Sequence, residues 1–225
     1  MTIRGVGILL GMAALGGVLF CLFDRHWRIS VNYNQPGSAM PTVSYHEGLW
    51  HRCSNSYNLG GQSNCAKMME AINHLPSELI FQRGFAVFAA IAGGIGVLFG
   101  MASAQRINFA SKQKDKNCCA TLAGVCYIVT AACIMAAASW SASHTLKDSK
   151  WDYGIVNTAG YNIIYTIGAD IYVGWVTGVM ALIAGCIMIF TSCNNDEYDD
   201  EMEYNTTQYA PPNTYNSAGT RKEYC

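Results

Sequence analysis

Four long stretches of the chain carry no formally charged side chain, and this pattern constrains the fold more than any other feature. The stretches cover residues 5–23, 84–105, 117–146 and 171–195. A helix of about 20 mostly apolar residues crosses the roughly 30 Å of bilayer hydrocarbon, and an Arg, Lys or Asp at its centre costs about 3 kcal/mol. The gaps therefore predict four transmembrane helices, at about 5–23, 84–105, 118–142 and 171–193.

The composition supports a membrane protein and excludes several other classes. Of the 225 residues, 51% are hydrophobic and 13% are charged, against about 25% charged in soluble domains. The 14 basic and 15 acidic residues nearly cancel, which argues against a nucleic-acid partner and against an acidic disordered regulator. No Ser/His/Asp or Cys/His constellation is legible, so we expect no catalysis and no cofactor, and membrane lipid as a partner.

The first apolar stretch has a second interpretation, as a cleaved signal peptide. This alternative is disfavoured because the stretch is longer than the roughly 7–15 apolar residues of a signal core. Residues 21–23, Cys-Leu-Phe, are also a poor small-residue cleavage site.

The distribution of Lys and Arg orients the spans. The short connection 104–118 contains four of them, whereas the 60 residues of 24–83 contain five. The positive-inside rule then places the short connection and both termini in the cytosol, and segments 24–83 and 143–170 outside. We expect one membrane domain, 1–193, followed by a polar, acidic and disordered cytosolic tail, 194–225.

Small residues recur within the predicted spans. Glycines spaced by four occur at Gly7/Gly11, Gly96/Gly100 and Gly174/Gly178. Small residues let helix backbones approach closely in lipid, where no hydrophobic force drives helices together. Packing within the chain's own bundle is the favoured interpretation, and a surface for lateral oligomerisation is the alternative.

Only two of the ten cysteines, Cys53 and Cys65, lie in a predicted outward-facing segment. This compartment is oxidising, and the turn formers at 58–61 between them favour a hairpin closed by one disulfide. A metal site with His46, His51 and His74 is disfavoured because the tight ligand spacing of zinc sites is missing. Residues 29–33 and 42–45 alternate apolar and polar side chains, which predicts a small antiparallel sheet.

The outer segment also carries a family resemblance. Trp27, Gly48-Leu49-Trp50, Cys53 and Cys65 resemble the W-GLW-C-C signature of the claudin family. Further matches, covering nearly the whole chain except the tail, are Arg83, 98–101, 139–140, 165–169 and 174–175. The signature is shared with peripheral myelin proteins and calcium-channel gamma subunits. The resemblance implies an all-α transmembrane four-helix bundle with a small extracellular antiparallel β-sheet.

What the family does supplies the expected function. Claudins polymerise with themselves and with other claudins, in cis and in trans, into tight-junction strands at the plasma membrane that seal or line paracellular pores. The stretch 66–74, with Met68, Met69 and Ile72, resembles the helix that docks onto a neighbour; packing only on its own sheet is the alternative. A second function also stays open: an accessory channel-modulating or myelin-like adhesion subunit.

Charges near the outer cysteines are the selectivity candidates that the resemblance implies. Ser54, Asn55 and Ser56 follow the first cysteine without an acid, and Arg52 and Lys67 lie nearby. With five basic and four acidic residues in 24–83, we expect a barrier or a weakly anion-preferring pore. The histidines at 26, 46, 51 and 74 have two interpretations. They either bind protons in acid and make the pore-lining segment 24–83 more positive, or they are ordinary polar surface residues.

The remaining candidates lie near the membrane surfaces. Cys118, Cys119 and Cys193 are expected at the cytosolic surface, as reduced thiols open to palmitoylation. Arg83 is expected to reach loop carbonyls or an acid such as Glu78. The C-terminal residues Glu223, Tyr224 and Cys225 are a PDZ ligand candidate, although claudin tails commonly end in Tyr-Val, and the alternative is no role.

Overall fold

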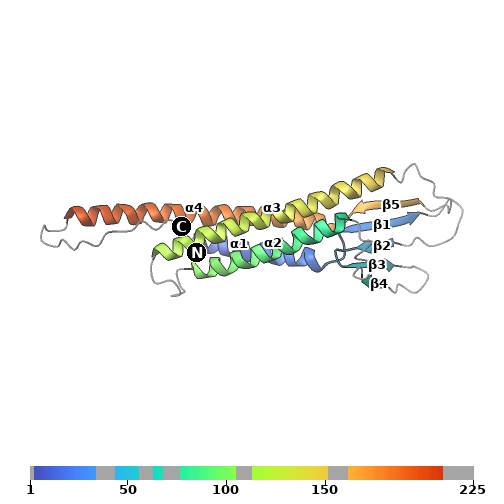
Figure 1. Cartoon of the computed structure of the whole chain (residues 1–225), viewed down its shortest axis with the longest axis horizontal. Helices are drawn as coiled ribbons and strands as arrows, with labels where there is room; N and C mark the ends of the chain where they lie inside the picture. Colours follow the sequence, from blue (N-terminus) through green and yellow to red (C-terminus); the bar gives the residue numbers. More distant parts are fainter. Residues whose placement is uncertain are drawn as a thin grey trace.

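The computed structural model describes residues 3–33, 44–55, 63–67, 77–104, 113–151 and 162–209. These residues form four helices, α1 (Ile3–Phe23), α2 (Ser77–Ala102), α3 (Gln113–Trp151) and α4 (Ala169–Tyr209). They also form five strands, β1 (Arg28–Tyr33), β2 (Ser44–Glu47), β3 (His51–Asn55), β4 (Ser63–Lys67) and β5 (Asn162–Ile167). The helices run lengthwise through an elongated molecule, and the strands gather at one end of it (Figure 1).

Each of the four helices contains a segment that is long and apolar enough to cross a membrane. These segments are Ile3–Phe23, Leu79–Ala102, Asp115–Lys147 and Ala169–Asn194. They confirm the four predicted spans, because an unbroken apolar run of this length satisfies its backbone polar groups only as a helix in lipid.

Two helices extend beyond the ends that the charge-free stretches predict. α3 continues to Trp151, so the predicted outer segment 143–170 begins inside a helix. α4 continues to Tyr209, through the start of the tail that we expected to be disordered. The physical reason is local, because residues 194–209 contain neither Gly nor Pro, and the first strong helix breakers are Pro211 and Pro212.

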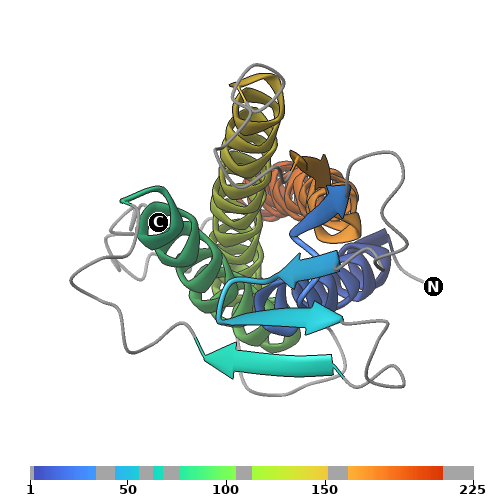
Figure 2. The ribbon, with the colours of Figure 1, turned by 90° about the vertical axis from the view of Figure 1, so that its right-hand side faces the viewer.

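The five strands form one antiparallel sheet with the order β4-β3-β2-β1-β5 (Figure 2). The predicted sheet in the first outer segment is therefore confirmed. β5 was not predicted: it comes from the segment before α4 and pairs with β1 from Arg28↔Ile167 to Tyr33↔Asn162. This pairing joins the two predicted outer segments into one layer.

Several glycines of the spans accept large side chains from neighbouring helices of the same bundle. Tyr127 of α3 packs so closely on Gly11 of α1 that a Cβ there would overlap its ring. A Cβ at Gly96 of α2 would lie 2.9 Å from the same ring. On α4, Gly178 packs in the same way against Met135 of α3. These glycines therefore serve packing within the chain's own bundle, as the favoured interpretation predicts.

Candidate functional site

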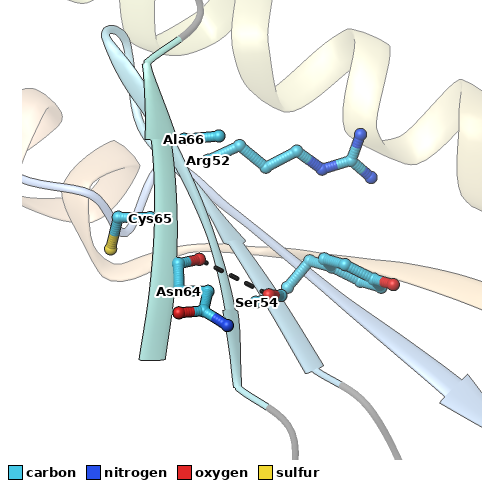
Figure 3. A pocket seen from close by; sticks show the side chains of 6 residues that line it. Arg52, Ser54, Asn64, Cys65 and Ala66 are labelled. Atoms are coloured by element: carbon cyan, nitrogen blue, oxygen red, sulfur yellow. Dashed lines mark hydrogen bonds between the residues drawn. The ribbon is translucent and has the colours of Figure 1, made fainter. Parts of the chain in front are cut away.

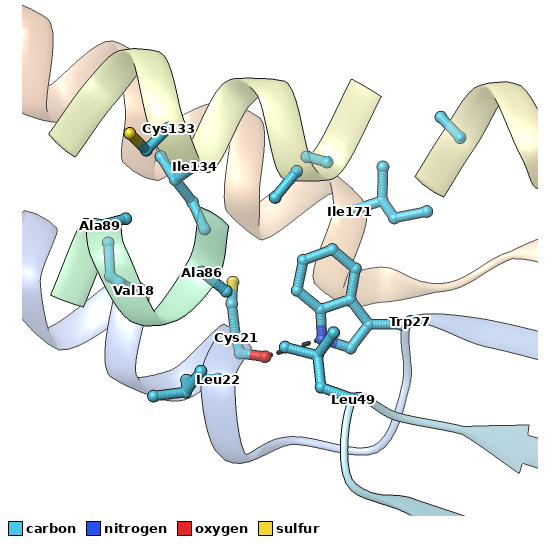
Figure 4. Packing of buried hydrophobic residues seen from close by; sticks show 13 residues of the cluster. Val18, Cys21, Leu22, Trp27, Leu49, Ala86, Ala89, Cys133, Ile134 and Ile171 are labelled. Carbon is cyan, nitrogen blue, oxygen red and sulfur yellow. Dashed lines mark hydrogen bonds between the residues drawn. The ribbon is translucent and has the colours of Figure 1, made fainter. Parts of the chain in front are cut away.

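The sheet is attached to the bundle through a buried aromatic and aliphatic cluster. Trp27 is 1% exposed and Leu49 is 0% exposed, and both pack with Cys21, Ile134 and Ile171 in one core (Figure 4). The Trp27 indole Nε1–H donates a hydrogen bond of 2.7 Å to the carbonyl oxygen of Cys21 near the end of α1. Burying a large aromatic ring with its polar N–H satisfied anchors the start of the sheet on the helices.

The Gly48-Leu49-Trp50 turn between β2 and β3 lies directly on the end of α1. A Cβ at Gly48 would lie 2.7 Å from the carbonyl oxygen of Asp24, so only glycine allows this approach. The Trp50 indole Nε1–H donates to the carbonyl oxygen of Leu22 at 2.8 Å. The turn therefore brings the second anchor of the sheet, Leu49, into the same core as Trp27.

Arg83 of α2 completes this attachment. Its Nε–H donates a hydrogen bond of 2.6 Å to the carbonyl oxygen of Leu49, and its guanidinium lies 5.0 Å from the centre of the Trp50 ring. The predicted contact of Arg83 with a loop carbonyl is thus confirmed. Trp27, the Gly48-Leu49-Trp50 turn and Arg83, spread over more than 50 positions of the sequence, meet at a single junction between α1, α2 and the sheet.

The disulfide between Cys53 and Cys65 joins β3 to β4, where the two residues face each other in the register. It confirms the bond that the two outer cysteines predicted. The Arg25 guanidinium lies against the disulfide, with Nη1 3.2 Å from the sulfur of Cys65. The bond holds the outermost strand β4 to the rest of the sheet.

A shallow hollow of about 420 Å³ opens on the sheet beside this disulfide. It is lined by Tyr45, Arg52, Ser54, Asn64, Cys65 and Ala66 (Figure 3). Arg52 is paired with Glu47 at 3.0 Å and lies 4.9 Å above the ring of Tyr45. Half of its side chain is exposed, so the hollow presents a cation whose charge is partly neutralised by its own sheet.

The described part of the sheet ends in an open edge at β4. The side chains of 64–67 are all exposed, including that of the selectivity candidate Lys67. Ala66 and Lys67 belong to this strand, so the expected helix does not begin at Ala66, because pairing with His51 and Arg52 of β3 holds them extended. Met68, Met69, Ile72, His74 and Ser56 lie outside the described residues, and Asn55 is the last residue of β3.

A pair of acidic residues that no sequence pattern indicated lies at the same junction. Asp170, in the first turn of α4, is 0% exposed, and its Oδ2 accepts the backbone N–H of His26 at 2.9 Å. Asp24, just after α1, holds the ring of the same histidine, with 3.0 Å between Oδ2 and Nδ1. The available signal was position: both acids directly border charge-free stretches, where side chains leave the membrane.

The environment shifts the pKa of two groups here. Burial raises the pKa of Asp24, but hydrogen bonds from His26 and from the backbone N–H of Arg25 outweigh it and leave this pKa below its ordinary value. Burial lowers the pKa of His46, and the nearby charge of His26 lowers it further. The two histidine rings lie 5.1 Å apart, which is close enough for a charge on His26 to disfavour protonation of His46.

A second buried polar cluster lies at the opposite end of the bundle. Arg4 of α1 is 5% exposed, and it donates to Asn117 Oδ1 of α3 at 2.9 Å. It also donates to the carbonyl oxygens of Ser103, which follows α2, and of Thr191 on α4, at 3.5 and 3.4 Å. One arginine thus connects all four helices. The sequence showed Arg4 only as the charge before the first span.

The other predicted sites stand as follows. Cys119 is a half-buried free thiol and Cys193 an exposed one. Cys118 is disulfide-bonded, which departs from the reduced thiol expected there. The PDZ candidates Glu223, Tyr224 and Cys225 lie outside the described residues. Within the part of the chain that the structure describes, no three His, Cys, Asp or Glu side chains are grouped so as to hold a metal ion.

With this geometry, comparison with known proteins identifies the family. The sequence model of the PMP-22/EMP/MP20/Claudin family matches residues 3–188. The match includes the first three spans, most of the fourth, the sheet and every signature residue. The chain therefore belongs to this family of four-span membrane proteins.

Individual relatives point to the claudin branch. The chain is 24% identical to claudin-4 of Bos taurus over 216 residues, which cover 96% of this chain and 98% of that protein. It is 26% identical to claudin-3 of Mus musculus over 224 residues, 95% of this chain and 94% of that protein. It is also 25% identical to claudin-15 of Rattus norvegicus over 215 residues, 94% and 89% of the two chains.

Proposed function

We propose that this protein is a structural component of tight junctions, which polymerises with itself and other claudins into strands between neighbouring cells. The observation that carries the proposal is the sheet: five described strands stand at one end of a four-helix membrane bundle and end in the exposed edge β4. An exposed strand edge offers unpaired backbone groups to another chain. The similarity to claudin-3, claudin-4 and claudin-15 supports this role over catalysis.

The proposed topology places the sheet outside the cell and both termini in the cytosol. The Cys53–Cys65 disulfide fits an oxidising exterior, and the basic connection 104–118 fits the cytosolic side. Domain 1–193 then forms the membrane unit and 194–225 the cytosolic tail. The free thiols of Cys119 and Cys193 are the proposed palmitoylation sites of the protein. The C-terminal Glu-Tyr-Cys is its proposed PDZ ligand.

We further propose that the strands form a barrier or a pore with a weak preference for anions. The hollow on the sheet presents Arg52, and Lys67 is exposed at the end of β4. The charge of Arg52 is partly cancelled by Glu47, so the net positive potential is small and strong selectivity is not expected.

The decisive experiment expresses the full chain in cells that lack tight junctions, followed by freeze-fracture electron microscopy. We expect continuous intramembrane strands at cell contacts. The double variant Cys53→Ser/Cys65→Ser should lose them, because β4 is no longer held to β3. The matched control Cys186→Ser alters a free, exposed thiol in a span and should keep the strands. Absence of strands, with co-purification of a channel, would favour the accessory-subunit function instead.

Selectivity is tested by sodium and chloride dilution potentials across an epithelial monolayer. The wild-type chain should seal the monolayer or favour chloride slightly, and Lys67→Glu should move the preference toward sodium. Lys147→Glu is the matched control, because this exposed lysine lies on α3, away from β4. A strong sodium preference of the wild-type chain would refute the proposed selectivity.

A further inference from the structure

Two carboxyl groups contact His26, one at its backbone and one at its ring. Asp170 of α4 accepts its backbone N–H, while Asp24 at the end of α1 contacts its ring nitrogen. The carboxyl groups of Asp24 and Asp170 are thus both held on one residue, His26. The end of α1, the approach to β1 and the start of α4 are thus tied together by one acidic cluster.

The cluster lacks one hydrogen-bond donor. Asp170 is fully buried, and its Oδ1 accepts no hydrogen bond from any described residue. A buried, ionised carboxylate is costly when one of its oxygens has no donor, and a second carboxylate in the same cluster adds repulsion. A proton held between Asp24 and Asp170 removes the repulsion and turns one carboxyl group into the missing donor. Paired carboxyl groups elsewhere bind a proton for this reason.

We propose that Asp24 and Asp170 form a proton-binding site that holds one shared proton at neutral pH and so fastens the sheet to the membrane bundle. The ligand is a proton rather than a metal ion, because the described residues offer no third acidic, histidine or cysteine ligand in a suitable position. The proposal concerns the folded chain itself and does not depend on its role in cell junctions.

The surroundings of the pair define what its proton controls. The other titratable groups that act on it are Cys21 of α1 and His26, with His46 of β2 behind the His26 ring. The two carboxyl groups cannot easily move apart, because the backbone is closely packed here: a Cβ at Gly168 would overlap the carbonyl of His26. Release of the proton therefore places two negative charges together at the point where β1 and β5 meet α4, and loosens this attachment.

Infrared spectroscopy of the purified full-length protein in detergent micelles tests the site directly. We expect a protonated-carboxyl C=O band at neutral pH that is lost in Asp170→Asn and also in Asp24→Asn. Asparagine keeps an acceptor for His26 and supplies an N–H donor to the remaining carboxylate, so both variants should fold. Glu47→Gln, which removes a carboxylate paired with Arg52, is the matched control and should keep the band.

Thermal unfolding of the same samples gives an independent readout. While the folded state holds one proton more than the unfolded state, the unfolding constant of the wild type should rise about tenfold per pH unit relative to Asp170→Asn as the pH increases. Absence of the band in the wild type, its persistence in either Asn variant, or identical pH profiles of wild type and Asp170→Asn would each overturn the proposal.

Discussion

Each end of the bundle buries one ionisable side chain, an acid at the sheet end and a base at the other. At the sheet end this side chain is Asp170, which accepts a backbone N–H from His26. At the other end it is the base Arg4, which donates to a side-chain amide and to backbone carbonyls. Both residues border charge-free stretches, and each connects segments that are far apart in the sequence.

The difference between the ends lies in what surrounds the polar groups. The sheet end adds the larger apolar core, around Trp27 and Leu49. The opposite end combines a smaller apolar cluster, which includes Ile8 and Met188, with hydrogen bonds among Arg4, Asn117, Thr121 and Ser192. Polar contacts contribute little net free energy but fix partners and register, while burial of large side chains contributes more. We therefore expect the sheet end to carry more stability and the Arg4 end to set helix register.

The largest effect should come from Trp27→Ala. Removing a fully buried aromatic ring leaves a cavity in the core that attaches the sheet, and should cost about 4 kcal/mol of unfolding free energy. Unfolding in detergent micelles measures this. Trp140→Ala, which removes a partly exposed Trp from the surface of α3, should cost far less; equal losses would contradict the importance of this core.

The disulfide should rank second. The double variant Cys53→Ser/Cys65→Ser opens a short loop, and loop-entropy reasoning predicts a loss of about 3 kcal/mol. Because the bond lies wholly within the sheet, hydrogen exchange should rise in β3 and β4 while the helices stay protected. Uniform loss of protection in α1 to α4 would show that the two ends are not independent.

Arg4→Met tests the opposite end. It removes the charged donor but keeps a long apolar side chain, and the lost hydrogen bonds should cost about 2 kcal/mol. Protection in hydrogen exchange should fall where α1 meets Asn117 and Thr191, with β1 unaffected. Lys147→Met, at an exposed position, is the matched control; a drop in sheet protection in Arg4→Met would refute the division of labour between the ends.

The smallest effect should be the acid dependence of Asp24. Its folded pKa is lowered, so it contributes stability above the unfolded carboxyl value of about 3.9, and this stability is lost as the pH falls through the folded value. His26→Gln removes a hydrogen bond that lowers this pKa, so acid unfolding should begin at higher pH. Thermal unfolding in acid measures this effect, with His51→Gln as the matched control. Identical acid profiles of His26→Gln and the control would contradict the Asp24–His26 contact.

Local patterns predicted much of the fold. The charge-free stretches were sufficient to predict the four spans. Burying a charge in lipid is so costly that membrane-spanning segments are recognisable by their lack of charged residues. Alternation predicted β1, and the compartment predicted the Cys53–Cys65 bond. The extensions of α3 to Trp151 and α4 to Tyr209 were missed because they carry charges that a hydropathy criterion excludes.

Long-range contacts account for the remaining misses. β5 is a strand because it pairs with β1, which is distant in the sequence. In the sequence, Asp170 is only the charge that borders the fourth charge-free stretch, and its burial depends on the approach of His26 across that same pairing. The residues next to Asp170 in the sequence do not indicate this long-range contact, so local patterns could not predict the carboxyl pair.

The sequence by itself determined the four membrane helices, the outer disulfide and the family signature, because each rests on a property of a single segment: its apolar length, its compartment or its residue types. Only the tertiary structure decided which charged residues are buried and what they contact. Burial belongs to the packing of several segments, and Arg4 and Asp170 acquire their partners only when segments that are distant in the sequence come together.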